Sequence, residues 1–236
     1  ARIRQDPAGT LVVEGVAALH AVQHRVIPDR IAAATYLCCA AAAGGSITVE
    51  GCIPAHLTAV LPPLEQAGCR FRIRGDTVSI TVPERLGSLG WIRTLPYPGF
   101  PTDAQAPLMA AAVRAEGTTV FTETIFENRY RHVSELVRLG SRIHTEGKVA
   151  IVTGVPRLHG ASVCCTDLRG GAALCAAALA AEGRSVITGI HHIERGYEHL
   201  DESLRQLGAN ITRSDHETEA EETQTEQSTA AEGAGA

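Results

Sequence analysis

The sequence predicts an α/β fold, an inside-out α/β barrel in which three β-α-β-α-β-β units place helices inside and strands outside. Three observations predict it. One pattern of Asp, Ala-rich stretch, Gly, β-rich run, amphipathic stretch and second Gly occurs three times in the 236 residues. The Ala-rich stretches are apolar nearly all round, which is typical of buried helices. The runs that follow them are rich in Val, Ile and Thr, which favour strands.

The three units agree closely in their spacing, as expected of an internal repeat. Each Ala-rich stretch follows an aspartate and ends at a glycine 16, 14 and 16 residues later, and a second glycine lies 23, 23 and 25 residues beyond the first. The aspartates are Asp29, Asp103 and Asp167, and the glycine pairs are Gly45 and Gly68, Gly117 and Gly140, and Gly183 and Gly208. A glycine after each helix supplies the left-handed residue that ends it.

The remaining elements of each unit follow from periodicity. The second stretch of a unit places apolar residues at helical spacing, as at Val133, Leu136 and Val137, which predicts an amphipathic surface helix. A closing strand follows the second glycine, and the third unit is expected to end in such a strand at 209–213. Further strands at 77–82 and 148–154 extend the first two units.

The ends of the chain differ from the repeats. Residues 1–23 hold two predicted strands, and we expect them to be the end of a preceding domain, before a main domain at 24–213. Residues 214–236 hold seven acids and no Lys or Arg, so we expect a disordered acidic tail. The net charge of −5 comes from this tail, because residues 1–213 hold 21 bases against 19 acids.

Composition excludes several classes of protein. Aromatic residues make up only 4%, which disfavours a stacking platform for nucleic acid. The seven cysteines form no C-x-x-C pair, so we expect reduced core thiols, no metal site and no cofactor. The apolar stretch at 31–44 is shorter than the roughly 20 residues that span a bilayer. Without a recognisable signal peptide, we expect a cytoplasmic protein with no membrane partner.

Five motifs resemble the enolpyruvyl transferases that act on UDP-N-acetylglucosamine. They are RVIPDRI at 25–31, PYPGFPTDAQ at 96–105, TETIFENRYRHVSEL at 122–136, TDLRGGAAL at 166–174 and HIERGYEHL at 192–200. The resemblance runs from about residue 2 to residue 213. It implies two inside-out α/β domains of three units each, of which this chain holds one.

The resemblance also implies an activity, the transfer of enolpyruvyl from phosphoenolpyruvate to the 3′-hydroxyl of UDP-N-acetylglucosamine. This is the first committed step of peptidoglycan synthesis. Such a reaction needs a base for the hydroxyl proton, an acid for the methylene carbon, and cations for the phosphate and carboxylate. The family carries a Lys-Asn motif and a mobile proton-donor loop in its N-terminal half. Neither occurs here, so we expect a fragment or a split subunit whose partner is the missing N-terminal domain.

The resemblance assigns roles to six residues. Asp103 matches the proposed base and sugar contact, with a plain helix N-cap as the alternative. Arg169 and Arg195 match arginines near phosphoenolpyruvate, Arg195 being placed in the catalytic group with Asp103. An ion pair with the neighbouring Asp167 is the alternative for Arg169. Residues that match further substrate contacts are Arg129 and, through their backbone groups, Ile125 and Phe126.

Two departures from the family pattern lie close to Asp103. Ala104 and Pro107 stand where larger or polar residues are usual. We place Pro107 in the first turn of the predicted helix, where proline is tolerated. Two alternative functions stay open. One is the sister enzyme that acts on shikimate 3-phosphate, and the other is a non-catalytic half-domain that binds a UDP-sugar or a partner half.

Overall fold

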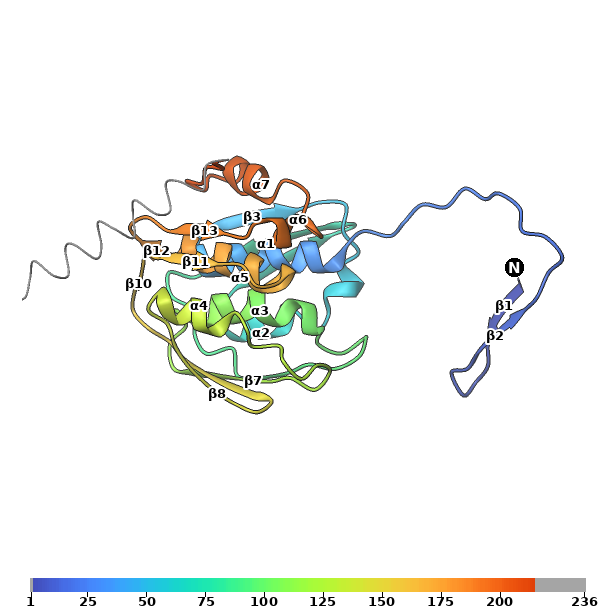
Figure 1. The fold of residues 1–236 in the computed structure, drawn as a ribbon, viewed down its shortest axis with the longest axis horizontal. Helices are drawn as coiled ribbons and strands as arrows, with labels where there is room; N and C mark the ends of the chain where they lie inside the picture. Colours follow the sequence, from blue (N-terminus) through green and yellow to red (C-terminus); the bar gives the residue numbers. More distant parts are fainter. Residues whose placement is uncertain (1, 215–236) are drawn as a thin grey trace, which may run out of the picture.

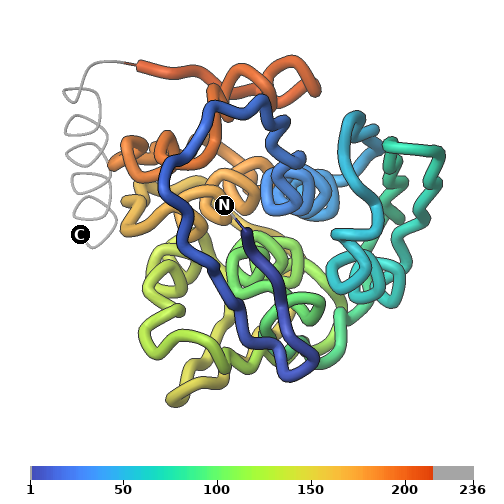
Figure 2. Tube along the Cα trace, turned by 90° about the vertical axis from the view of Figure 1, so that its right-hand side faces the viewer, coloured from blue at the N-terminus to red at the C-terminus, as the bar shows by residue number. Residues whose placement is uncertain are grey.

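Three helices form the centre of the molecule. The computed structural model describes residues 2–214, and its core helices are α1 (Arg30–Ala43), α3 (Thr102–Ala112) and α5 (Leu168–Leu179). Each of the three packs against the other two. Figure 2 views them end-on, with the strands and the shorter helices arranged around them. The predicted arrangement of units with helices inside and sheets outside is confirmed in this respect.

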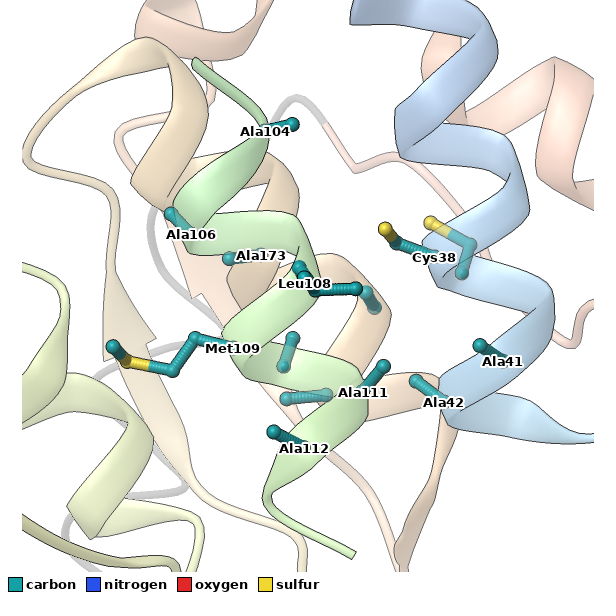
Figure 3. Close-up of a cluster of buried hydrophobic side chains, with 14 of the residues drawn as sticks. Cys38, Ala41, Ala42, Ala104, Ala106, Leu108, Met109, Ala111, Ala112 and Ala173 are labelled. Carbon is teal, nitrogen blue, oxygen red and sulfur yellow. The ribbon is translucent and has the colours of Figure 1, made fainter. Parts of the chain in front are cut away.

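Small side chains allow the three helices to lie close together. Ala104, Ala111 and Ala173 are completely buried, as is Leu108, which fills the space between the helices. Figure 3 shows these residues with Cys38 of α1 at the helix contacts. Because an Ala side chain ends at Cβ, neighbouring helix backbones approach closely and few voids remain. Buried residues lie on most faces of each of the three helices, and they belong to one core cluster that runs through all three units.

The first unit forms a three-stranded antiparallel sheet in the order β3-β5-β4. Its strands are β3 (Ser46–Val49), β4 (Arg70–Arg74) and β5 (Thr77–Thr81). Between β3 and β4 the chain forms a short 3₁₀ helix, η1 (Pro54–Leu57), and α2 (Leu61–Gln66). The predicted strands and amphipathic helix of this unit are confirmed. Among the described residues, the unit has no strand directly before α1.

The second unit has all six predicted elements. Its sheet has the order β6-β7-β9-β8, in which β6 and β7 are parallel and the other pairs antiparallel. The strands are β6 (Trp91–Arg93), β7 (Thr118–Thr122), β8 (Arg142–Glu146) and β9 (Val149–Thr153), and the surface helix is α4 (Val133–Arg138). The parallel pairing of β6 with β7 brings the ends of two strands to the start of α3.

The third unit departs from the prediction at its end. Its strands are β10 (Leu158–His159), β11 (Ser162–Cys164), β12 (Ala181–Glu182) and β13 (Val186–Thr188), followed by α6 (His191–Glu194) and α7 (Leu200–Gln206). The four strands form two parallel pairs, β10-β12 and β11-β13.

The prediction of a closing strand at 209–213 is wrong, because this segment has no strand structure. In the first two units the closing strand pairs with a following strand, β4 with β5 and β8 with β9. Up to residue 214, the third unit offers no such strand. The carbonyl of Ile211 instead accepts a hydrogen bond from Arg205 Nε at 2.9 Å.

The two strands predicted near the start of the chain form an antiparallel hairpin, β1 (Arg2–Gln5) with β2 (Leu11–Glu14). An exposed segment, 15–29, connects it to α1, and the hairpin lies well apart from the helical core (Figure 1). Its apolar side chains are exposed, including Ile3 and Val13. The tail expected at 214–236 lies outside the described residues, apart from Ser214.

The glycines of the repeat behave as expected. All six have φ between 84° and 99°, the left-handed region that glycine enters without steric cost.

Two side chains, those of Val137 and Cys164, differ from the prediction. Val137 of α4 is exposed because it lies on the outer face of this short helix, whereas Val133 and Leu136 are buried. Six cysteines are buried free thiols, and Cys164 is exposed at the end of β11.

No helix in the described part of the chain has the length and apolarity needed to span a bilayer.

We predict that Gly154→Ala destabilises the protein strongly. A Cβ at this position would lie 1.5 Å from the carbonyl oxygen of Ala115, so the backbone must move. We expect a loss of about 3 kcal/mol or more in the free energy of unfolding, measured by urea denaturation. Gly15→Ala is the matched control, because nothing lies within 4 Å of its Cβ position, and it should change stability little. Equal stability of the two variants would contradict the packing described here.

Candidate functional site

The aspartates of the repeat differ in what they bind. Asp29 and Asp167 are the N-caps of α1 and α5, and each accepts two backbone N–H groups of its helix. Asp103 lies one residue inside α3, whose N-cap is Pro101 without a side-chain cap. The second unit therefore leaves its aspartate free of the capping role that the other two perform, which removes the N-cap alternative for Asp103.

The Asp103 carboxylate lies between two guanidinium groups. Arg129 Nη2 is 2.6 Å from Oδ1, and Arg169 Nη2 is 3.3 Å from Oδ2. The Asp103 side chain is 40% exposed, whereas those of Arg129 and Arg169 are 22% and 12% exposed. Solvent therefore reaches the carboxylate while the two cations are held mostly inside. Three segments that are distant in the sequence meet here, the start of α3, the loop before α4 and the start of α5.

Pro107 interrupts the hydrogen bonding of α3. It lies inside α3 and not in the first turn as we predicted, because the helix already begins at Thr102. Proline has no N–H group, so the backbone carbonyl of Asp103, four residues earlier, lacks its usual helical donor.

Arg169 is held by aromatic and polar contacts from two other elements. Its guanidinium carbon lies 5.2 Å from the centre of the Tyr197 ring. The Tyr197 hydroxyl lies 2.7 Å from Oγ1 of Thr35, in the first turns of α1. Nε and Nη1 of Arg169 are buried without a hydrogen-bond partner among the described residues. The guanidinium pairs with Asp103 and not with Asp167, and it lies against the Tyr197 ring.

Ile125 and Phe126 follow β7 and are partly exposed, at 38% and 51%. Their backbone N–H groups donate to Oε1 of Glu123, at 2.7 and 3.1 Å. The Phe126 ring also lies 5.5 Å from the guanidinium carbon of Arg129. Because both N–H groups are engaged, the carbonyl oxygens and side chains of this segment are what it offers to a ligand.

Sequence reasoning missed Glu123 and Tyr197, which are both buried. Glu123 stands inside a run of Thr and Glu at a strand end, where a charge usually indicates a solvent-facing residue. The available signal was that Glu123 stands two residues before Ile125 within a motif of the resemblance. Tyr197 stands two residues after Arg195 in another such motif.

Arg195 is not brought to the cluster that Asp103 forms with Arg129 and Arg169. It is the C-cap of α6, its side chain is exposed, and it makes no ion pair with another residue between 2 and 214. A shallow depression of about 450 Å³ borders the same loop and is lined by Glu194, Gly196, Tyr197, Glu198 and His199. Tyr197 is the link between this loop and Arg169.

His132 lies beneath the cluster and is almost completely buried. Burial lowers the pKa of His132 to about 4, although the nearby Asp167 acts in the opposite direction. Its Nε2 has no hydrogen-bond partner among the described residues. A neutral imidazole therefore packs between the loop that carries Arg129 and the start of α5.

A family model described as EPSP synthase (3-phosphoshikimate 1-carboxyvinyltransferase) matches residues 1–204. The chain belongs to the EPSP synthase family. Among curated relatives, the UDP-N-acetylglucosamine 1-carboxyvinyltransferase 1 of Symbiobacterium thermophilum is 50% identical over 213 residues, 90% of this chain and 48% of the relative. The UDP-N-acetylglucosamine 1-carboxyvinyltransferase of Koribacter versatilis is 48% identical over the same share of this chain and 49% of the relative. This member of the EPSP synthase family thus spans about half the length of these relatives.

Two solved structures agree with the fold. The enolpyruvyl transferase NikO from Streptomyces tendae matches with a TM-score of 0.70 and 30% identity, over 79% of this chain and 44% of NikO. An EPSP synthase from Acinetobacter baumannii matches with a TM-score of 0.67 over 91% of this chain and 53% of that protein, but at 21% identity. The α/β fold of repeated units predicted from the sequence is confirmed.

We predict that His132 makes the protein less stable as the pH falls from about 6.5 to about 4. The folded-state pKa of about 4 lies below the usual value of 6.5, so the unfolded chain binds a proton first in this range. Between pH 7 and pH 5 we expect the free energy of unfolding to fall by about 2 kcal/mol from this residue. Urea denaturation of the wild type and of His132→Asn at both pH values measures it. An equal pH dependence in the two proteins would contradict a neutral, buried imidazole.

Proposed function

We propose that this chain provides one half of the active site of an enolpyruvyl transferase, which moves enolpyruvyl from phosphoenolpyruvate to the 3′-hydroxyl of UDP-N-acetylglucosamine. The reaction would then be the first committed step of peptidoglycan synthesis. The observation that carries the proposal is the Asp103 carboxylate held between Arg129 and Arg169. Relatives at 46–50% identity that are named for this activity support the choice of substrates. Both substrates are water-soluble anions, which fits the cytoplasmic location expected from the sequence.

Asp103 is the proposed base and sugar contact. Its carboxylate has about four acceptor positions, of which the two arginines occupy two, so a hydroxyl can still donate to it. When the hydroxyl oxygen attacks C2 of phosphoenolpyruvate, its proton passes to Asp103 and C3 receives a proton from an acid. Loss of phosphate and of a C3 proton from the tetrahedral intermediate then yields the enolpyruvyl ether.

The arginines are the proposed anion partners. Phosphoenolpyruvate carries a phosphate and a carboxylate, and a guanidinium fork fits both groups. Arg169 has two buried nitrogens without a partner among residues 2–214, which fits it to receive one of these anions. Arg195 has an exposed side chain and would reach the substrate from the α6 loop. Arg129 holds Asp103 and lies against Phe126, in the proposed sugar-binding segment.

We place the proton donor in an N-terminal half. Burial raises the pKa of the Cys39 and Cys165 thiols to about 12, which makes them unsuited to that role. The hairpin in residues 1–23, with its exposed apolar side chains, would belong to that half, and residues 24–213 would form the domain described here. The partner of this chain would then be the domain that carries the Lys-Asn motif and the donor loop.

Two alternatives remain distinguishable. The sister activity on shikimate 3-phosphate shares the fold and the phosphoenolpyruvate chemistry, and the family model bears its name. The identity to the nucleotide-sugar enzymes favours the first activity. A chain that binds a UDP-sugar or a partner half without turnover would retain affinity for UDP-N-acetylglucosamine but show no transfer even when an N-terminal half is supplied.

We predict that the 236-residue chain alone releases no measurable phosphate from phosphoenolpyruvate and UDP-N-acetylglucosamine. A general acid contributes about 10²–10⁴-fold, and the loss of a cationic contact adds a factor of similar size. Joined to the N-terminal half of the Symbiobacterium relative, it should release phosphate with this acceptor and not with shikimate 3-phosphate. Turnover by the chain alone at the rate of the joined protein would contradict the division of the site.

We predict that Asp103→Asn lowers kcat of the joined protein by about 10²-fold or more and changes UDP-sugar binding little, because the amide is no base. Asp29→Asn is the matched control. Asp29 caps α1, and Asn caps a helix as well as Asp, so kcat and stability should be nearly unchanged. Steady-state kinetics and calorimetric binding measure both variants. A fully active Asp103→Asn protein would remove Asp103 from the mechanism.

A further inference from the structure

A buried carboxylate joins the two parts of the proposed acceptor site. Glu123 directly follows β7, and its side chain is completely buried. Its Oε1 accepts hydrogen bonds from Oγ1 of Thr94 at 2.9 Å and from the backbone N–H groups of Ile125 and Phe126. Its Oε2 accepts from Oγ1 of Thr102 at 2.8 Å. Four donors from three segments of chain thus converge on one side chain.

These contacts close a ring that contains Asp103. Thr102 is the first residue of α3 and binds Glu123, and Asp103 is its neighbour in sequence. Asp103 binds Arg129, Arg129 lies against the Phe126 ring, and the Phe126 N–H returns to Glu123. Each link of the ring is either a covalent bond or one of these contacts. A movement of α3 relative to the 125–126 segment must therefore break at least one of them.

Comparison with the other units indicates that this arrangement is not needed for the fold. The first residue after the corresponding strand is Glu50 in the first unit, and it is exposed. In the third unit the corresponding residue is Gly189, which has no side chain to bury. A buried carboxylate is unfavourable unless hydrogen bonds satisfy it. Only the unit that carries the arginine-bound aspartate buries one at this position.

We infer that Glu123 is a positioning residue that fixes the distance between Asp103 and the Ile125–Phe126 segment, and so sets the fit of the acceptor sugar. This inference rests on the proposed function. Glu123 is completely buried and therefore acts through other residues. Its carboxylate orients the 125–126 backbone from one oxygen and the start of α3 from the other. The acceptor hydroxyl at Asp103 and the sugar at Ile125 and Phe126 are then held at one spacing.

The link through Thr102 can be tested in the 236-residue chain itself. Thr102→Val keeps the shape of the side chain and removes the hydroxyl that donates to Glu123. Because Oε2 then loses its donor, we expect the Ile125 and Phe126 amides, more than 20 residues away, to exchange hydrogen about tenfold faster by NMR. Thr102→Ser restores the hydroxyl and should restore slow exchange. Unchanged exchange at both amides in Thr102→Val would overturn the inference.

The effect on the acceptor is measured in the joined protein. Glu123→Gln keeps one acceptor oxygen and loses the charge that strengthens its hydrogen bonds. We expect the KM for UDP-N-acetylglucosamine to rise about tenfold in Glu123→Gln and Thr102→Val, and the KM for phosphoenolpyruvate to change less than about threefold. Thr102→Ser should return the acceptor KM to near the wild-type value.

A control separates positioning from general stability. Thr48→Val removes a hydroxyl that lies 2.9 Å from Oγ of Ser79 on the first sheet, away from the site, and should leave both KM values unchanged. Equal changes in both KM values for Glu123→Gln, or a lower melting temperature with unchanged KM values, would overturn the inference. If the wild-type joined protein shows no transfer, the proposed function fails, and the exchange rates of Ile125 and Phe126 still decide the role of Glu123.

Discussion

The close packing of three Ala-rich helices determines where the rest of the molecule lies. Because α1, α3 and α5 touch along their lengths, their first turns come together at one end of the core. Arg169 at the start of α5 thus reaches Asp103 at the start of α3, and Tyr197 bridges from Arg169 to Thr35 of α1. A larger side chain at Ala104 or Ala173 would separate the helices and, with them, the groups at their starts.

The site arises where the repeat is broken. Asp29 and Asp167 show the default use of the shared aspartate, which is to satisfy the free N–H groups at the start of a helix. In the second unit Pro101 takes the N-cap position, and Asp103 becomes available to arginines from other segments. Its chemistry therefore comes from a shift of two positions, from the N-cap to the second residue of the helix, against an otherwise regular scaffold.

Local patterns predicted the fold better than they predicted the site. The helices and most strands follow from periodicity and glycine placement, which depend on neighbours in sequence. The prediction of a strand at 209–213 was wrong, because a strand needs a partner strand and periodicity does not reveal whether a partner strand exists. The residue types at the site were predicted from motifs, but the contact of Asp103 with Arg129 and Arg169 depends on three distant segments. Glu123 was missed because sequence alone does not tell a buried charge from an exposed one.

The first and the last strands of the described residues share one physical property. The first two, β1 and β2, form a two-stranded ribbon with exposed Ile3, Leu11 and Val13. The last, β13, pairs with β11 alone, so one row of its backbone groups has no neighbouring strand among residues 2–214. An open strand edge is a template for another strand, and an apolar ribbon is a surface that water disfavours. Self-association that grows with protein concentration is the expected behaviour of the chain when nothing covers these two surfaces.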